Sequence, residues 1–214
     1  MTMDWETLGL QVEVPSGVPL ALLLRHAERP PLPAHAPGND VTLTQAGLEA
    51  SWRLGQALGH QLLRLYTSPV PRCQETAEAL RAGAGTSCGV EQDRMLGDPG
   101  VFVVDPQQAW RSWLARGAGT VAHALMTGRD VPPGFADPAQ SARKLAAHVC
   151  HHLPDTPGMH VFVTHDTVLG PFIAQAFGQV LTAKTWPGFL HGALLWKDGE
   201  RQVLAYREWK GVVG

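Results

Sequence analysis

Short apolar runs recur along the chain and predict the strands of a sheet. The clearest is Leu20–Leu24, whose five apolar residues are long enough for a buried strand and too short to cross a membrane. Further short strands are predicted at residues 65–67, around Val90 and at residues 161–164. Pro30 and Pro31 cannot donate ladder hydrogen bonds, so the first strand must end before them.

The C-terminal region has the pattern of a β-hairpin. Residues 192–196 and 202–209 are two apolar segments on either side of Asp198-Gly199, a strong turn signal. A hairpin requires an antiparallel strand pair, so the predicted sheet is mixed.

Amphipathic segments lie between the apolar runs and predict helices. Thr44 is a good N-cap for a helix with one apolar face, made up of Ala50, Leu54, Ala57, Leu58 and Leu62. A second helix is predicted from about Arg72 to Leu80. Asp105-Pro106 and Asp137-Pro138 each combine an N-cap with proline at the first helical position. The later of these two helices has the apolar face Ala142, Leu145, Ala146, Val149 and Leu153.

A final helix is predicted for the apolar run 168–177, with Pro171 tolerated in its first turn. Strands that alternate with helices indicate an α/β fold. We expect a three-layer αβα sandwich with a mostly parallel, mixed sheet, in one domain over residues 1–214. A turn-rich insertion within residues 97–138 is the expected lid or cap.

Composition narrows the class of protein. The formal net charge is −2, and no run of Lys or Arg is present, which argues against a nucleic-acid partner. The three cysteines have no C-x-x-C spacing, and no H-x-E pattern accompanies the histidines, so we expect no metal and no other cofactor. Neither a signal peptide nor a membrane span is evident, so we expect a cytoplasmic protein without a membrane partner.

Charged residues follow three of the predicted strands. Arg25 and His26 end the first strand, His165 and Asp166 follow the strand at 161–164, and Arg72 follows the strand at 65–67. Because the carboxyl ends of parallel strands meet at one edge of a sheet, these side chains are expected to converge. Arginines hold phosphoryl groups by paired hydrogen bonds, and a neutral imidazole can attack phosphorus.

At these residues the sequence resembles the histidine phosphatase superfamily, also called the phosphoglycerate mutase-like family. The matching motifs appear in the family's order: Arg25-His26-Ala27, Asp40 with Leu43-Thr44 and Gly47, Ser68-Pro69-x-x-Arg72-x-x-Glu75-Thr76-Ala77, and Val163-Thr164-His165-Asp166. They extend over most of residues 20–170. R-H-x-x-R-P and H-D favour the acid phosphatase branch, whereas the chain lacks the length of that branch's usual helical insert.

The resemblance implies phosphoryl transfer in two steps through a phosphohistidine on His26. For this, the second ring nitrogen of His26 should donate to a backbone carbonyl, which leaves the attacking nitrogen unprotonated. The resemblance also implies that Arg25, Arg72 and Arg29 bind the phosphate oxygens. His165 would complete the phosphate site as a hydrogen-bond donor, expected as an imidazolium beside the phosphate dianion.

The general acid has two candidates. In the acid phosphatase branch it is the aspartate after the second histidine, which here is Asp166. In another branch it is an acid between the arginine helix and the second histidine, for which Asp98 is the nearest match. The sequence interpretation prefers Asp166 and keeps Asp98 as the alternative.

We therefore expect a metal-independent phosphatase that acts on a small phosphorylated substrate. Two other functions stay open. One is phosphotransfer of the phosphoglycerate mutase type, which needs a second phosphate site; the other is a phosphate-binding regulatory module with little turnover. The sequence does not identify the substrate or the oligomeric state.

Overall fold

The computed structural model describes residues 5–213; residues 1–4 and 214 of the predicted domain lie outside the described residues. One sheet has the strand order β3-β2-β4-β1-β5-β6-β7. The strands are β1 (Pro19–Arg25), β2 (Leu62–Thr67), β3 (Val90–Gln92), β4 (Gly158–Thr164), β5 (Gly192–Asp198), β6 (Arg201–Tyr206) and β7 (Trp209–Val213). The α-helices are α1 (Gln45–Leu58), α2 (Pro71–Ala84), α3 (Pro106–Arg116), α4 (Ala118–Thr127), α5 (Pro138–His151) and α6 (Asp166–Phe177). Short 3₁₀ helices are η1 (Trp5–Leu8), η2 (Gly59–Gln61) and η3 (Arg94–Leu96).

The sheet is mixed, as predicted. Strands β3, β2, β4 and β1 are parallel neighbours, whereas β5, β6 and β7 continue the sheet in antiparallel pairs. Two antiparallel steps separate β6 from β1, so β6 runs in the same direction as the four parallel strands. Most of the strands therefore point one way.

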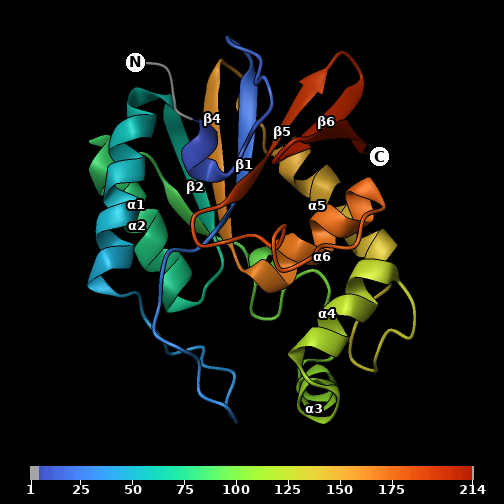
Figure 1. Cartoon of the computed structure of the whole chain (residues 1–214). Helices are drawn as coiled ribbons and strands as arrows, with labels where there is room; N and C mark the ends of the chain where they lie inside the picture. The colour runs from blue at the N-terminus through green and yellow to red at the C-terminus, as the bar shows by residue number, and fades with distance from the viewer. Residues whose placement is uncertain (1–4, 214) are drawn as a thin grey trace.

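Helices cover both faces of the sheet (Figure 1), with α1 and α2 on one face and α5 and α6 on the other. Strand β1 shows why its sequence is apolar at every position. Leu20, Leu22 and Leu24 pack into the core under α1 and α2, while Ala21 and Leu23 pack into the core under α5 and α6. Successive side chains of a strand point to opposite faces, and both faces here are buried. The predicted three-layer α/β fold is confirmed.

Part of the predicted apolar face of α1 is wrong. Ala50 is exposed, and Leu62 lies in β2, because the helix ends at Leu58. Small residues bring α1 close to α2: a Cβ on Gly55 would collide with the carbonyl oxygen of Leu80. Close packing of the two backbones, rather than interlocking large side chains, therefore decides which residues of α1 are buried.

The C-terminal strands also differ from the prediction. Residues 202–209 do not form one strand, because the chain turns at Arg207 and returns as β7. Tyr206 pairs with Trp209, which leaves a two-residue hairpin loop, and Arg207 has the positive φ of 51° that such loops require. The loop residues Arg207-Glu208 include no Gly, Asn or Asp, the usual turn residues, so the sequence pattern did not reveal this turn.

Pro171 is not in the first turn of its helix. Helix α6 begins at Asp166, which makes Pro171 its sixth residue. The N–H that proline lacks would have bonded to the carbonyl of Thr167, an exposed residue in the first turn. Helix α6 continues through the proline without this one hydrogen bond.

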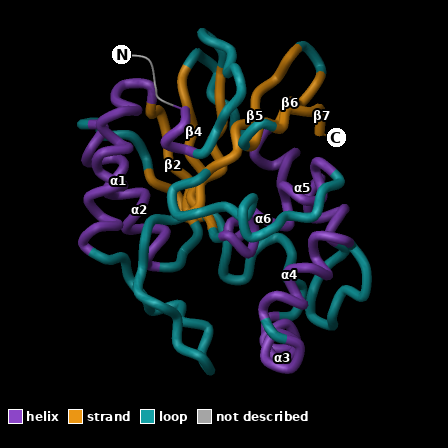
Figure 2. The backbone as a smooth tube through the Cα atoms, viewed as in Figure 1, coloured by secondary structure: helices purple, strands orange, loops and turns teal. Residues whose placement is uncertain are grey.

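Helix α3 lies apart from the two helical layers, and α4 lies between it and α6 (Figure 2). Helices α3 and α4 belong to the segment 97–138, which the sequence predicts as a lid. Helix α4 packs against α6. Within residues 5–213, no helix combines the length and the apolar character needed to cross a bilayer.

Candidate active site

The predicted side chains converge at the carboxyl edge of the sheet. Arg25 and Thr164 are paired residues at the ends of the neighbouring strands β1 and β4, and His26 and His165 follow them directly. The two imidazole rings meet edge to face, with 5.4 Å between their centroids. Arg72 enters from the first turn of α2, which follows β2. The topology thus joins residues that lie about 140 positions apart in the sequence.

His26 is held as a neutral imidazole with one free nitrogen. Its Nδ1 donates to the carbonyl oxygen of Ala27 at 2.8 Å, so the proton is on Nδ1 and not on Nε2. The side chain is 1% exposed, and burial lowers its pKa to about 3, with the positive charges of Arg72 and Arg25 acting in the same direction. The predicted backbone hydrogen bond is present.

Arg72 connects the two histidines. Its Nε donates to His26 Nε2 at 3.2 Å, and its Nη2 donates to His165 Nδ1 at 3.3 Å. Its Nη1 donates to the carbonyl oxygen of Gly38 at 2.8 Å, which ties the loop before α1 to the site. A guanidinium is planar and rigid, so these three hydrogen bonds orient both imidazole rings.

The contacts of His165 are those of a neutral imidazole, while the imidazolium expected beside a phosphate dianion stays a prediction. Its Nδ1 must accept, because Arg72 has only donors; its Nε2 therefore carries the proton and donates to Ser68 Oγ at 3.0 Å. Burial, followed by the charge of Arg72, holds the pKa of His165 well below its usual value. Gly97 lies against this ring: a Cβ there would come within 2.6 Å of it.

Arg25 is anchored through one end of its guanidinium. Nη2 forms an ion pair with Asp166 Oδ2 at 3.0 Å, and Nη1 donates to the carbonyl oxygen of Pro187 at 2.7 Å. Its Cζ lies 4.3 Å from the ring centroid of Phe189. Arg29 Nη1 donates to the carbonyl oxygen of Pro30 at 2.9 Å.

Two donors of these arginines have no protein partner. Arg25 Nε and Arg29 Nε are the buried side-chain nitrogens without an acceptor among the described residues. Buried donors are nearly always satisfied, and unsatisfied ones commonly mark a functional position. Two such donors beside His26 and Arg72 are suited to accept an anion.

The two candidate acids have different surroundings. Asp166 Oδ2 accepts from Arg25 and also from Trp186 Nε1 at 3.2 Å, while Oδ1 accepts from the backbone N–H of Thr167 at 3.0 Å. The side chain of Asp98 is exposed, and its Oδ2 lies 3.5 Å from Arg94 Nη2. Both carboxylates line the same cavity.

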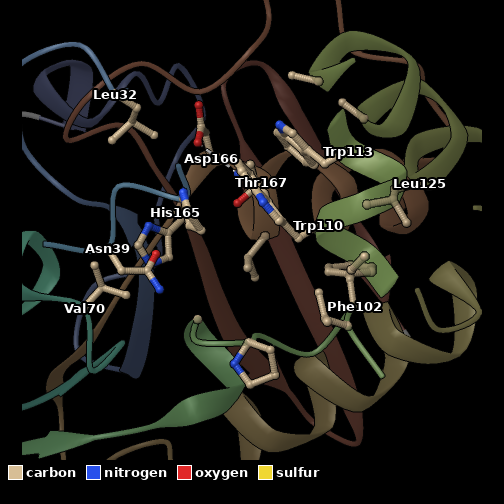
Figure 3. Close-up of a pocket in the computed structure, with 18 of the residues that line it drawn as sticks. Leu32, Asn39, Val70, Phe102, Trp110, Trp113, Leu125, His165, Asp166 and Thr167 are labelled. Atoms are coloured by element: carbon tan, nitrogen blue, oxygen red, sulfur yellow. Dashed lines mark hydrogen bonds between the residues drawn. The ribbon is translucent and has the colours of Figure 1, made fainter. Parts of the chain in front are cut away.

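That cavity has a volume of about 800 Å³. All of the predicted site residues except Arg25 line it: His26, Arg29, Arg72, Asp98, His165 and Asp166. Figure 3 shows Trp110, Trp113 and Leu125 on the side of α3 and α4, opposite His165 and Val70. The cavity therefore extends from the histidine pair to the inner surface of α3 and α4.

Several residues that complete the site carried no motif. Trp186, Pro187 and Phe189 come from the loop between α6 and β5, where the sequence shows no pattern that relates them to Arg25 or Asp166. Thr76, by contrast, lies within a motif: its Oγ1 accepts from the N–H of Ala27 at 3.1 Å and donates to the carbonyl oxygen of Arg72 at 2.7 Å. Thr76 thereby links the nucleophile loop to α2.

No group of three or more His, Cys, Asp or Glu side chains within residues 5–213 is placed to hold a metal ion. Cys73 is fully buried beside His165, and burial raises the pKa of its thiol to about 12. This thiol is therefore a packing residue at neutral pH.

The fold is similar to that of solved phosphatases. A mycobacterial glucosyl-3-phosphoglycerate phosphatase is 20% identical over 91% of this chain and 97% of its own, with a TM-score of 0.54. A phosphoserine phosphatase mutant from Entamoeba histolytica, solved with phosphoserine, is 15% identical over 86% of this chain and 94% of its own, with a TM-score of 0.58. YhfR of Bacillus stearothermophilus is 22% identical over 89% of this chain and 97% of its own, with a TM-score of 0.59. The structural similarity to these proteins shows a common fold.

No curated protein sequence matches the chain. The family model of the histidine phosphatase superfamily, branch 1, matches residues 21–204. This is the phosphoglycerate mutase-like branch, so R-H-x-x-R-P and H-D occur here outside the acid phosphatase branch that they favoured in the sequence. The matched region holds His26, Arg72 and His165 and nearly the whole sheet. The chain belongs to branch 1 of the histidine phosphatase superfamily.

Proposed function

We propose that the protein is a metal-independent phosphatase that hydrolyses a phosphomonoester through a phosphohistidine on His26. The observation that carries this proposal is the neutral His26, with its unprotonated Nε2 held between arginines at the end of a cavity. The phosphatases that share the fold act on other phosphomonoesters, as their names state, which supports the reaction class.

The proposed reaction has two steps. In the first, His26 Nε2 forms a bond to phosphorus, the bond from phosphorus to the ester oxygen breaks, and the leaving alcohol receives a proton from a carboxylic acid. In the second, water attacks phosphorus, the carboxylate takes a proton from that water, and the bond to Nε2 breaks. Inorganic phosphate and the free histidine result.

The arginines stabilise the charge on the phosphoryl oxygens. Arg25 Nε and Arg29 Nε are buried donors without protein acceptors, and Arg72 Nε faces the attacking nitrogen itself. Such preorganised donors supply most of the stabilisation in phosphoryl transfer. The N-terminus of α6, which begins directly after His165, adds backbone donors on the same side.

The contacts favour different roles for the two aspartates. Both oxygens of Asp166 already accept hydrogen bonds, from Arg25, Trp186 and the Thr167 N–H. A protonated Asp166 would have to give up one of these bonds to place its own proton. We therefore assign Asp166 to the orientation of Arg25 and proton donation to Asp98, which reverses the preference drawn from the sequence.

A mutase needs a second group of phosphate-binding residues in the cavity. The basic side chains that line the cavity are His26, Arg29, Arg72 and His165, and all of them belong to the site around the nucleophile. The distribution of charge therefore favours hydrolysis of a substrate with one phosphate.

The test is hydrolysis of p-nitrophenyl phosphate in the presence of EDTA, compared between the wild type, His26→Ala and the control His123→Ala on the exposed side of α4. We expect turnover in the wild type and the control, and none in His26→Ala. A phosphorylated His26, detected by intact mass after an alkaline quench, should accumulate in the wild type. Loss of turnover on chelation contradicts the proposal, and tight phosphate binding without turnover on any ester identifies a binding module instead.

A further inference from the structure

Charged and apolar side chains line different parts of the cavity. Charged side chains are confined to the end that holds the two histidines, together with Asp98 and Asp166. The rest of the cavity is apolar. Its large side chains come from α3, α4 and the segments near them: Phe102, Trp110, Trp113, Leu125, Met126 and Leu181. A phosphate bound at the histidines would thus place its ester group against hydrocarbon and aromatic surface.

From this division we propose that the substrate is the phosphate monoester of an apolar alcohol, whose hydrocarbon group occupies the space under α3 and α4. This inference rests on the proposed phosphatase function and names its substrate class. Burial of apolar surface contributes about 0.8 kcal/mol for each CH₂ group removed from water. Each carbon added to a hydrocarbon substituent therefore strengthens its binding in this cavity.

A polar substituent would lose hydrogen bonds to water without replacing them. Apart from the indole N–H groups, the neutral polar side chains among the described cavity residues are Asn39, Thr167 and Thr182. The Thr182 hydroxyl already lies 3.2 Å from the hydroxyl of Thr185. Hydroxyl or amide groups that are buried without a hydrogen-bond partner weaken binding. Sugar, glycerate and amino-acid phosphates, the kind of substrate named for the similar structures, are therefore disfavoured.

The size of the cavity also points to a long substituent. Its volume of about 800 Å³ is far larger than a phosphate group requires. Cavities of this size hold ligands with a few tens of atoms. The half-buried Trp110 and Trp113 line it along α3, while the nearly fully buried Leu125 lines it from α4. Helices α3 and α4 thus offer apolar side chains to one side of the substituent.

The experiment is a series of n-alkyl phosphates from ethyl to octyl, assayed for phosphate release below their critical micelle concentrations. We expect kcat/KM to rise about fourfold for each added methylene, the equivalent of about 0.8 kcal/mol. Phosphoserine and glucose 6-phosphate should be poorer substrates than butyl phosphate. A flat series, or a preference for the polar esters, would overturn the inference.

Gly119 offers a variant that shortens the cavity. It lines the cavity from the first turn of α4, and a Cβ there would meet no atom within 4 Å, so the position has room for the start of a larger side chain. In Gly119→Leu, kcat/KM for octyl phosphate divided by kcat/KM for butyl phosphate should fall at least about tenfold, because several methylene groups lose their space. The matched control is Thr120→Leu, next along α4, exposed and outside the cavity lining, in which the ratio should stay as in the wild type.

Binding separates this inference from the proposed function. Calorimetric titration of His26→Asn with butyl and octyl phosphate requires no turnover and should show tighter binding of the octyl ester. If p-nitrophenyl phosphate is not hydrolysed by the wild type, the proposed function fails while this titration still tests the cavity. If small esters are hydrolysed but octyl phosphate binds no tighter than butyl phosphate, the assignment of the substrate class is wrong.

Discussion

Arg72 Nε points at the nitrogen of His26 that is left unprotonated, at a distance of 3.2 Å. The nucleophile is thus aligned by a donor that is also placed to bind the phosphoryl group it attacks. The same guanidinium reaches His165 Nδ1 and the carbonyl of Gly38 with its other nitrogens. One rigid side chain therefore sets the relative position of both histidines and of the loop beside them.

Arg72→Lys should lower kcat strongly, although it conserves the charge. An ammonium group has one nitrogen and cannot reach three acceptors that are spread around a planar fork. We expect a loss of about 10²–10³-fold in kcat for p-nitrophenyl phosphate. Arg81→Lys, on the same helix but ion-paired with Glu78 outside the site, is the matched control. A loss of only a few-fold in Arg72→Lys would show that charge alone suffices.

The two aspartates should respond differently to the leaving group. If Asp98 donates the proton, Asp98→Asn should lower kcat/KM for an alkyl phosphate by about 10²–10⁴-fold, because an alkoxide leaves poorly without a proton. Hydrolysis of p-nitrophenyl phosphate, whose phenolate leaves readily, should fall by about tenfold or less.

Asp166→Asn should instead lower kcat/KM for both esters to a similar extent, by about 10²-fold, because Arg25 loses the ion pair that orients it. The measurement is kcat/KM for both esters in the wild type and the two variants. An alkyl-specific loss in Asp166→Asn would return the role of proton donor to Asp166.

The free energy of unfolding should decrease as the pH falls below about 6.5. In the folded protein burial lowers the pKa of His26 to about 3, whereas the unfolded chain binds a proton near the ordinary value of 6.5. Between these two pKa values the unfolded state holds one more proton than the folded state. For this histidine the free energy of unfolding therefore decreases by about 1.4 kcal/mol for each unit by which the pH is lowered. His165, whose pKa is also lowered, adds to the same slope.

Urea unfolding of the wild type and His26→Asn at pH 7, 6 and 5 checks this dependence. As the pH is lowered, the free energy of unfolding should decrease less steeply in the variant, and the difference in slope should correspond to about one bound proton. Equal slopes in the two proteins would mean that His26 takes up a proton in the folded state within this range.

Gly97→Ala should impair the site through His165. Its φ is 157°, and a Cβ at this position would lie 2.5 Å from Ser68 Oγ, so there is no room for a methyl group. We expect a loss of kcat of about 10²-fold, because the imidazole must shift away from Arg72. Gly89→Ala is the control, since a Cβ there meets no atom within 4 Å. Activity in Gly97→Ala equal to that of the control would show that the position of His165 is not critical.

Much of the site was predictable because its residues sit at strand ends. The run Leu20–Leu24 identified β1, and the topology of parallel strands then implied that Arg25-His26 and His165-Asp166 would meet. These are local signals combined with one general rule, so distance along the chain did not obscure them. The parallel strands and the resemblance to the family were identified from these same stretches of sequence.

Other features depend on neighbours that no motif names. The side chain of Trp186 approaches Asp166, and the carbonyl of Pro187 approaches Arg25, only once the loop before β5 folds over the site. The same is true of Gly97, whose contact with His165 is made across the sheet edge. Sequence patterns could not assign these residues, because their partners are set by tertiary contacts.

Apolar periodicity and strand-end positions are properties of the linear chain. They predicted the α/β fold and the convergence of Arg25, His26, Arg72 and His165, and the family motifs then implied the roles of these residues. The protonation of the site and the shape of its cavity became visible only in the folded molecule. Burial and the charge of Arg72 lower the pKa of His165, and the part of the cavity away from the histidines is apolar because α3 and α4 line it. Charge states and cavities are collective properties of residues far apart in sequence, and they exist only after the chain has folded.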